Sequence, residues 1–176
     1  MSEFLGRLVL EEIPHDKLQM VVYFDFAFLD SDGRLWPCFR GDIIDGATIP
    51  RFGWTIFGSP YTGLYRRAAA PHDTAYMYQL RSQIEADRML REAAKCDRTG
   101  KAMAWIMERA VRNFGLSAWR DLNQGDHNID LVPDEVRAMP CDVFIPQQYR
   151  TELAALKEYC FDRYALMLMM QAKQGT

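Results

Sequence analysis

The first third of the chain alternates apolar runs with turn-forming residues. Residues 18–28 are rich in β-branched and aromatic side chains, residues 30–33 read Asp-Ser-Asp-Gly, and residues 34–39 form a second apolar run. This pattern predicts a hairpin, in which Pro37 places the returning strand at a sheet edge or gives it a break. With a further candidate strand at residues 4–10, we expect a small antiparallel sheet.

Apolar residues then recur at helical spacing. Residues 62–80 are rich in Ala and Tyr, and Ser82–Glu85 reads as a capping box that begins a second helix, which runs to about Asp97. A third helix is predicted over residues 101–114, with Gly115 at its end and an apolar stripe formed by Ala102, Ile106, Ala110 and Phe114. The short link around Arg81 makes the first two helices antiparallel neighbours.

The last third of the chain is polar before it becomes helical again. Residues 121–146 carry Asn, Asp, Gly and Pro and predict a long loop with one helical turn after Pro133. A final helix over residues 147–173 has one apolar face, formed by Leu153, Leu156, Cys160, Tyr164, Met167 and Leu168. This face either completes the chain's own core or docks on a partner, through self-association or on another protein.

These patterns predict an α+β fold. Its small N-terminal antiparallel sheet packs on a central helical hairpin and a third helix, and a C-terminal helical arm follows. We expect a single α+β domain over residues 1–120 and a loop with the helix arm over residues 121–176. The chain has 176 residues, of which 49% are apolar and 26% charged, so it is long enough for one core and too apolar for whole-chain disorder.

The charge distribution bears on possible partners. The net charge is -3, which argues against a protein that binds nucleic acid by neutralising phosphates. Residues 62–114 nevertheless have a net charge of +4. They form either a solvated helix face or a surface that attracts an anionic ligand to the central helices.

Neither a membrane span nor a zinc site is predicted. No apolar run approaches the roughly 20 residues that a transmembrane helix needs, and the N-terminus lacks a secretory signal pattern, so we expect the protein in the cytoplasm. The cysteines form no C-x-x-C pair and have no His within four residues, which argues against zinc: they are Cys38, Cys96, Cys141 and Cys160.

The candidate chemistry lies in two neighbouring helices. His72 and Tyr76 interrupt the apolar face of the helix over residues 62–80, and Asp87 interrupts the apolar face of the next helix. Because the two apolar faces should meet, and because a buried carboxylate without a partner is costly, we expect Asp87 to bond His72 or Tyr76.

Two readings of this cluster follow from the residues. A carboxylate that holds one ring nitrogen of His72 frees the other to take a proton, so His72 can act as a general base, while the adjacent Asp73 holds a metal or orients a water. Alternatively, His72, Tyr76 and Asp87 form a buried network that only pins two helices. If the helix restarts at Pro71, the helix dipole would also favour ionised Asp73 and neutral His72.

A second marker lies upstream, at residues 45–50, which read Asp-Gly-Ala-Thr-Ile-Pro. Asp45 and Gly46 favour a turn, and Pro50 forces an extended residue before it. Asp45 either faces the His72 site or caps backbone amides in a strand-to-helix turn.

In the order and spacing of its motifs, the chain resembles a family of short phage- and prophage-encoded proteins of unknown function. The shared pattern is the Asp-Gly-Ala-Thr-Ile-Pro segment, His-Asp-x-x-Tyr at residues 72–76, Asp87, Phe114-Gly115 and Trp119. It covers about residues 4–120. The resemblance implies a phage or prophage origin and no settled activity.

The His-Asp-x-x-Tyr segment is also similar to the active-site helix of secreted phospholipases A2. This resemblance implies that His72 activates water, that Asp73 binds calcium, and that Tyr76 and Asp87 support the base. The chain departs from these enzymes because it lacks their cysteine framework and because residues 57–63 are a poor substitute for their Gly-rich calcium loop.

The sequence therefore leads to two hypotheses. The first is a small phage-encoded hydrolase acting on cell-envelope material, lipid or peptidoglycan, in which His72 is the general base and Asp73, Tyr76, Asp87 and Asp45 assist. The second is a non-catalytic phage structural or accessory protein that binds another protein. In either case we expect it in the cytoplasm of the infected or lysogenic host, with the virion as the alternative. Access of His72 to solvent discriminates between the two.

Overall fold

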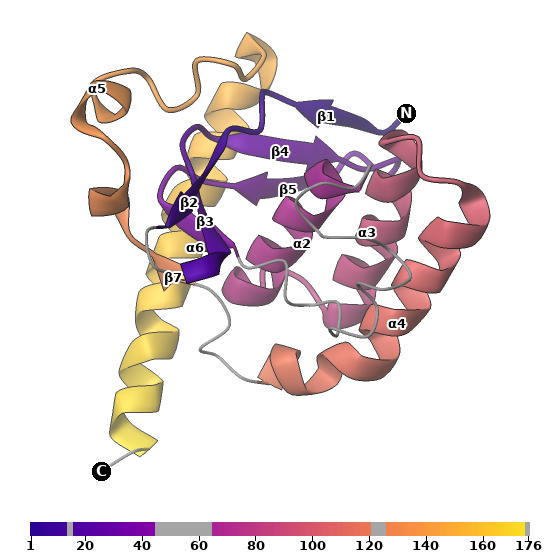
Figure 1. Cartoon of the computed structure of the whole chain (residues 1–176). Coiled ribbons are helices and arrows are strands. Elements are labelled where there is room, and N and C mark those ends of the chain that lie inside the picture. Colours follow the sequence, from indigo (N-terminus) through magenta and orange to yellow (C-terminus); the bar gives the residue numbers. More distant parts are fainter. Residues whose placement is uncertain (14–15, 45–64, 121–125, 175–176) are drawn as a thin grey trace.

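The computed structural model describes residues 1–13, 16–44, 65–120 and 126–174 (Figure 1). Its strands form two antiparallel sheets, of order β1-β4-β5 and β2-β3-β6-β7. The strands are β1 (Glu3–Leu5), β2 (Leu10–Ile13), β3 (Asp16–Val22), β4 (Phe26–Leu29), β5 (Leu35–Cys38), β6 (Asp42–Ile44) and β7 (Asp126–His127). The helices are α2 (Arg66–Tyr78), α3 (Gln83–Cys96), α4 (Lys101–Arg120), the 3-10 helix η1 (Ile129–Leu131), α5 (Asp134–Arg137) and α6 (Gln147–Gln174).

The predicted hairpin is present. Strand β5 pairs with β4 and forms the edge of its sheet, as Pro37 requires. The turn between them is fastened by Asp30, whose carboxylate accepts the backbone N–H of Arg34 at 2.8 Å and the indole N–H of Trp36 at 2.9 Å. Gly33 supplies the left-handed conformation of the turn, with φ +79°.

The apolar run over residues 18–28 is not one strand. Strand β3 ends at Val22, and β4 begins at Phe26 in the other sheet. Asp25 lies between them and is buried, where its backbone N–H donates to the carbonyl of Cys141 at 2.8 Å. The buried Asp25, whose backbone N–H bonds to Cys141 in a distant segment, thus separates the apolar run into strands of two different sheets.

Helices α2 and α3 pack on the β1-β4-β5 sheet, and α4 packs on α3 and α2 (Figure 1). Phe28 and Trp36 of the sheet share one apolar cluster with Met89, Leu90 and Met107 of the helices. The capping box at Ser82 and Glu85 is confirmed at the start of α3. The chain therefore has the predicted α+β fold, with a small antiparallel sheet packed on a helical hairpin and third helix.

Pro71 does not restart a helix. It lies inside α2, which begins at Arg66, so His72 and Asp73 are in the middle of the helix and not in its first turn. The helix-dipole argument for these two residues is therefore wrong. Thr74 lies beside the proline and donates its hydroxyl to the carbonyl of Pro37 at 2.7 Å, which ties α2 to strand β5.

The predicted apolar stripe of α4 is also wrong, because it faces outward. Ile106 and Phe114 are 39% and 52% exposed, whereas Met107, Val111 and Gly115 are buried. The helix does not end at Gly115 but continues to Arg120. Close packing against Tyr76, and not helix termination, accounts for a glycine at this position.

The C-terminal segment returns to the body of the protein. The helical turn after Pro133 is confirmed as α5, and α6 packs against α2 and β5. Leu153 and Cys160 of α6 are buried beside Leu5 and Tyr78, so this part of the apolar face completes the chain's own core. The last turns extend beyond the body in Figure 1, and Leu166 and Met169 there are 58% and 63% exposed.

No helix within the described ranges combines the length and the apolar character that crossing a membrane would require.

Candidate functional site

The predicted cluster forms where α2 and α3 lie side by side. Nε2 of His72 is 3.2 Å from Oδ1 of Asp87, and the hydroxyl of Tyr76 donates to the same oxygen at 2.9 Å. The predicted contact of Asp87 with His72 and Tyr76 is thus confirmed. Because a carboxylate oxygen accepts, Nε2 of His72 is the donor in this contact; in the tautomer that carries its proton on Nε2, the lone pair lies on Nδ1.

The cluster is deeply buried. His72 is 1% exposed and Asp87 is 0% exposed. Burial together with the neighbouring Asp87 carboxylate raises the pKa of Tyr76 well above its usual value. Tyr76 therefore stays neutral over the physiological range and remains a donor to Asp87.

Aromatic contacts fix the position of Tyr76, one of the two residues that contact Asp87. The ring centroid of Tyr76 lies 4.6 Å from that of His72 and 5.0 Å from that of Trp119, and the rings of Tyr76 and Trp119 meet edge to face. Gln79 holds the end of α4 in place by donating its amide N–H to the carbonyl of Trp119 at 2.6 Å. Trp119 thus packs against the ring of Tyr76 and limits its movement.

Gly115 is the closest approach of α4 to the cluster. A Cβ atom at this position would lie 2.5 Å from the hydroxyl oxygen of Tyr76. Only glycine leaves room for that hydroxyl to reach Asp87. Asp87, Gly115 and Trp119 therefore all contact Tyr76: Asp87 accepts its hydroxyl, Gly115 leaves room for that hydroxyl, and Trp119 packs on its ring.

The second oxygen of Asp87 has different surroundings. Oδ2 is buried and has no hydrogen-bond partner among the described residues. A buried carboxylate oxygen without a donor is costly, by about 1–3 kcal/mol. The carboxylate is therefore held through Oδ1 alone, which makes its two donors, His72 and Tyr76, the groups on which its position depends.

Of the other two predicted site residues, Asp73 and Asp45, the structure describes only Asp73. Asp73 follows His72 on α2 and is half-buried, and it takes part in interactions of its own. Asp45 lies outside the described residues.

Asp73 alone does not make a calcium site. Calcium takes six to eight oxygen ligands. Within residues 1–13, 16–44, 65–120 and 126–174, no group of three or more His, Cys, Asp or Glu side chains could hold a metal ion. No such side-chain group therefore accompanies Asp73 in the described part of the chain, and its predicted role as a calcium ligand stays a prediction.

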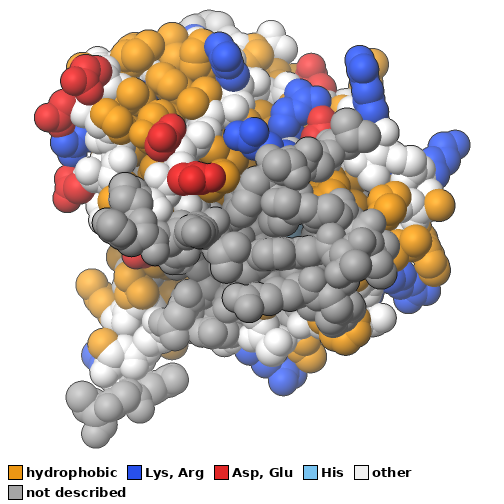
Figure 2. All heavy atoms as spheres, in the orientation of Figure 1, with side chains coloured by type: hydrophobic (Ala, Val, Ile, Leu, Met, Phe, Trp, Pro, Cys, Tyr) orange, Lys and Arg blue, Asp and Glu red, His pale blue; other side chains and the backbone are white. Residues whose placement is uncertain are grey.

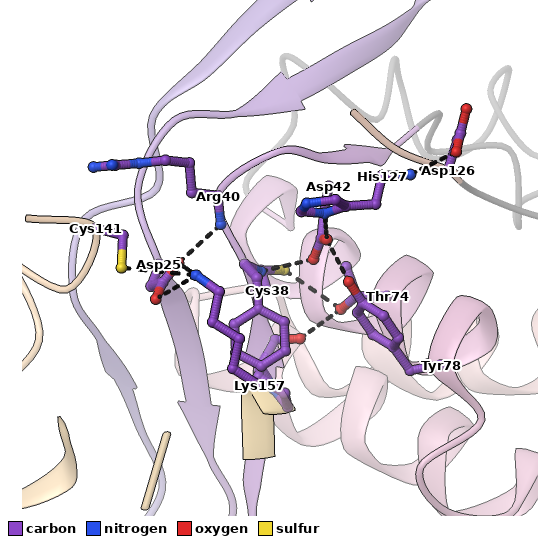
Figure 3. Close-up of polar contacts among 12 residues, drawn as sticks. Asp25, Cys38, Arg40, Asp42, Thr74, Tyr78, Asp126, His127, Cys141 and Lys157 are labelled. Carbon is purple, nitrogen blue, oxygen red and sulfur yellow. Dashed lines mark hydrogen bonds and ion pairs between the residues drawn. The ribbon is translucent and has the colours of Figure 1, made fainter. Parts of the chain in front are cut away.

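A second His-Asp-Tyr cluster joins the N-terminal and C-terminal segments (Figure 3). Oδ1 of Asp42 accepts the hydroxyl of Tyr78 at 2.5 Å and lies 2.9 Å from Nδ1 of His127. Asp42 is fully buried, and burial with the Asp42 charge raises the pKa of Tyr78 strongly. The sequence predicts a loop over residues 121–146 and gives no sign of this cluster, because nothing in a polar loop indicates pairing with a residue 85 positions away.

Figure 3 also shows a third buried carboxylate, Asp25, beside α6. Nζ of Lys157 lies 3.1 Å from Oδ1 of Asp25 and 3.7 Å from the sulfur of Cys141. The backbone N–H of Arg40 donates to the same carboxylate at 2.8 Å. This cluster fastens α6 to the sheets, and none of these contacts involves a histidine.

Comparison with known proteins gives a family but no activity. A family model described as "Protein of unknown function (DUF1353)" matches residues 20–111. An uncharacterized protein, y4jT, of Sinorhizobium fredii (strain NBRC 101917 / NGR234) is 40% identical over 63 residues, which are 36% of this chain and 18% of that protein. A second uncharacterized protein of the same strain, y4iH, is 30% identical over 112 residues, which are 64% of this chain and 47% of that protein.

The matched regions thus span less than half of the length of either relative. No solved structure matches the chain.

Proposed function

The chain belongs to the DUF1353 family of proteins of unknown function, and we propose that it is a small hydrolase in which His72 is the general base. The proposal includes a phage or prophage origin, which we infer from the order of the motifs. It also includes action on cell-envelope material, lipid or peptidoglycan, in the infected or lysogenic host or at the virion.

One observation carries the proposal. Oδ1 of Asp87 accepts from both Nε2 of His72 and the hydroxyl of Tyr76. This is the arrangement that the resemblance to secreted phospholipases A2 implies, in which a distant Asp and a Tyr support the histidine. It leaves Nδ1 of His72 as the proton acceptor and keeps the ring from rotating.

The reaction we propose is hydrolysis by activated water. Nδ1 of His72 takes a proton from water while the water oxygen bonds to the carbonyl carbon of the substrate. The bond from that carbon to the leaving group then breaks, and the imidazolium returns its proton to the leaving group. Asp87 stabilises the imidazolium between these steps, and Tyr76 holds the carboxylate in place.

A different observation favours a second function. His72 is 1% exposed and Asp87 is 0% exposed, and a base must reach its substrate. The alternative is therefore a non-catalytic phage structural or accessory protein in which His72, Tyr76 and Asp87 only pin α2 to α3. Under this alternative the chain acts by binding another protein.

The experiment is hydrolysis by purified protein with His72→Gln, Asp87→Asn and His127→Gln as variants. The substrates are phospholipid vesicles and purified peptidoglycan, each with and without millimolar calcium, and the products are free fatty acid and the new amino groups that amide hydrolysis releases from peptidoglycan. The hydrolase proposal expects turnover that falls by at least about a hundredfold in His72→Gln. His127→Gln is the matched control, because it also removes a His–Asp contact between distant segments but lies outside the proposed site.

The outcomes separate the two functions. Turnover that survives in His72→Gln contradicts the assignment of the base. No turnover of either substrate, together with a loss of stability in His72→Gln, favours the buried network and a binding role.

A further inference from the structure

Helix α4 carries two apolar faces, of which one is buried in the fold and the other is exposed. Its inner face, which includes Met107 and Val111, is buried against the helical core. Its outer face presents large apolar side chains to solvent: Trp105 is 49% exposed, Ile106 39% and Leu116 45%. Large apolar side chains gathered on one exposed helix face mark an interaction surface more often than isolated ones do.

The solvent-exposed charges on the same helix have one sign. Its acidic residue, Glu108, is 5% exposed and is paired with Arg91 and Arg112 at 3.0 Å and 2.7 Å. The charged residues that α4 presents to solvent are all basic: Lys101, Arg109 and Arg120. The outer face of α4 is thus apolar and cationic.

This local charge runs against that of the whole chain. Residues 88–120 hold eight Lys and Arg against three Asp and Glu, a net charge of +5, whereas the whole chain has a net charge of -3. Because exposed charges are screened beyond about 10 Å at 0.1 M salt, the local sign and not the total decides what approaches α4. In Figure 2, hydrophobic side chains lie beside Lys and Arg side chains along the right-hand edge, where α4 runs in Figure 1.

We propose that the outer face of α4 binds an anionic lipid surface. Cations among Trp and aliphatic side chains are the composition of helices that lie in the membrane interface, where the charges meet headgroups and the apolar groups enter the acyl boundary. The proposal goes beyond the proposed function and does not depend on whether His72 is catalytic.

The arrangement fits a fluid surface better than an acidic protein. Trp105 and Leu116 are eleven positions apart, about 16 Å along the helix, with Ile106 turned to one side. A protein partner would need pockets matched to each of these side chains, whereas lipid fills in around them. The guanidinium of Arg109 lies 5.4 Å from the ring centroid of Trp105, so its stem covers apolar surface while its charge can reach a headgroup.

The fold also prepares the helix for this role. An isolated helix must order itself when it binds a membrane. The buried residues of the inner face already hold α4 as a helix of 20 residues against the core, so the cost of forming the helix does not arise on binding. The helix therefore needs fewer apolar contacts than a free amphipathic segment does.

The test is co-sedimentation of the full chain with vesicles, either phosphatidylcholine alone or phosphatidylcholine with phosphatidylglycerol. We expect binding to the anionic vesicles that weakens with salt, and little binding to the neutral ones. Ile106→Asn should lower partitioning about tenfold, and Arg109→Gln about fivefold. Leu166→Asn on α6 and Arg137→Gln on α5 are matched controls, since they remove the same kinds of group from other surfaces.

Tryptophan emission gives an independent readout. Entry of Trp105 into the interface should shift the emission of the protein to shorter wavelength when anionic vesicles are added. Trp105→Phe should lose that change while the other tryptophans keep their spectrum. Circular dichroism of each variant should match that of the unmodified chain, because all these side chains are exposed.

Several results would overturn the proposal. One is the absence of binding to anionic vesicles by the unmodified chain, and another is equal loss of binding in the control variants. A salt-sensitive complex with polyglutamate but none with vesicles, lost in Arg109→Gln, would assign the face to an acidic protein instead. A dimer that dissociates in Ile106→Asn without vesicles would assign it to a second copy of the chain.

Discussion

A methyl group added at Gly115 tests the geometry of the His72 cluster. In Gly115→Ala the new Cβ would lie 2.5 Å from the hydroxyl oxygen of Tyr76, which is well inside van der Waals contact. Since the hydroxyl is 2.9 Å from Oδ1 of Asp87, a shift of the ring away from α4 breaks that hydrogen bond. Burial on α4 leaves the backbone of Gly115 little freedom to absorb the clash.

The size of the effect follows from three terms. Loss of a hydrogen bond to a charged acceptor costs about 1.5–3 kcal/mol, and overpacking costs about 1–3 kcal/mol. Alanine is favoured over glycine in a helix by about 1 kcal/mol, which offsets part of this. We therefore expect Gly115→Ala to lower the free energy of unfolding by about 2–4 kcal/mol, measured by urea denaturation.

A double-mutant cycle isolates the cause. In Tyr76→Phe the hydroxyl is absent, and the new Cβ would meet ring carbons at 3.3 Å and 3.4 Å, a contact that a small ring movement relieves. Gly115→Ala should then cost about zero or stabilise slightly, so the coupling energy is about 2–4 kcal/mol. Gly100→Ala is the control, because nothing lies within 4 Å of its Cβ position.

An additive cycle would refute this reasoning. If Gly115→Ala costs the same with Tyr76 and with Phe at that position, the hydroxyl does not lie against Gly115. The bond between Tyr76 and Asp87 would then have to be re-examined as well, because the same placement of the ring supports both.

Four further predictions follow from the same contacts. Asp87→Ala should cost about 1–3 kcal/mol in urea denaturation, because two buried donors lose their acceptor; an unchanged midpoint would contradict the buried network. If the resemblance to phospholipases A2 extends to metal binding, calorimetry should show calcium binding at millimolar concentration that weakens in Asp73→Asn; absence of heat removes the calcium role and leaves a metal-free base. Deleting residues 147–176 should leave a chain that is unfolded by circular dichroism, because buried core side chains are lost, whereas a folded product would support a docking arm. Burial and neighbouring Asp126 raise the pKa of Tyr164 to about 12, so its contribution to stability is present below pH 10 and is lost as the pH rises towards 12; urea midpoints across that range should fall in the unmodified chain and fall less in Tyr164→Phe.

The His72 cluster could be predicted because its causes are local. Helical spacing places His72 and Tyr76 on one face, and the capping box at Ser82 fixes where the next helix begins. A link this short makes the two helices antiparallel neighbours, so Asp87 is expected to contact His72 or Tyr76. Each step depends on residues fewer than twenty positions apart.

The second cluster could not be predicted because its causes are distant. His127 reaches Asp42 through β7, a strand of two residues that adds to the sheet from a polar loop. Two residues carry no alternation that a pattern could reveal. Tyr78 lies on α2 two positions after Tyr76, on a different side of the helix, and nothing in its spacing indicates a carboxylate partner.

The misassigned face of α4 shows what periodicity alone leaves undecided. Residues 102, 106, 110 and 114 repeat at the helical period, but so do 104, 107, 111 and 115, and both sets are apolar or small. Glu108 and Gly115 decide which of the two faces is buried. Glu108 points inward because Arg91 of α3 and Arg112 neutralise it there, and Gly115 points inward because Tyr76 needs the space. A helix with two apolar faces thus buries the one that carries the glycine and the paired acid, and it exposes the other, which carries Arg109 and Arg120 and which we propose binds lipid.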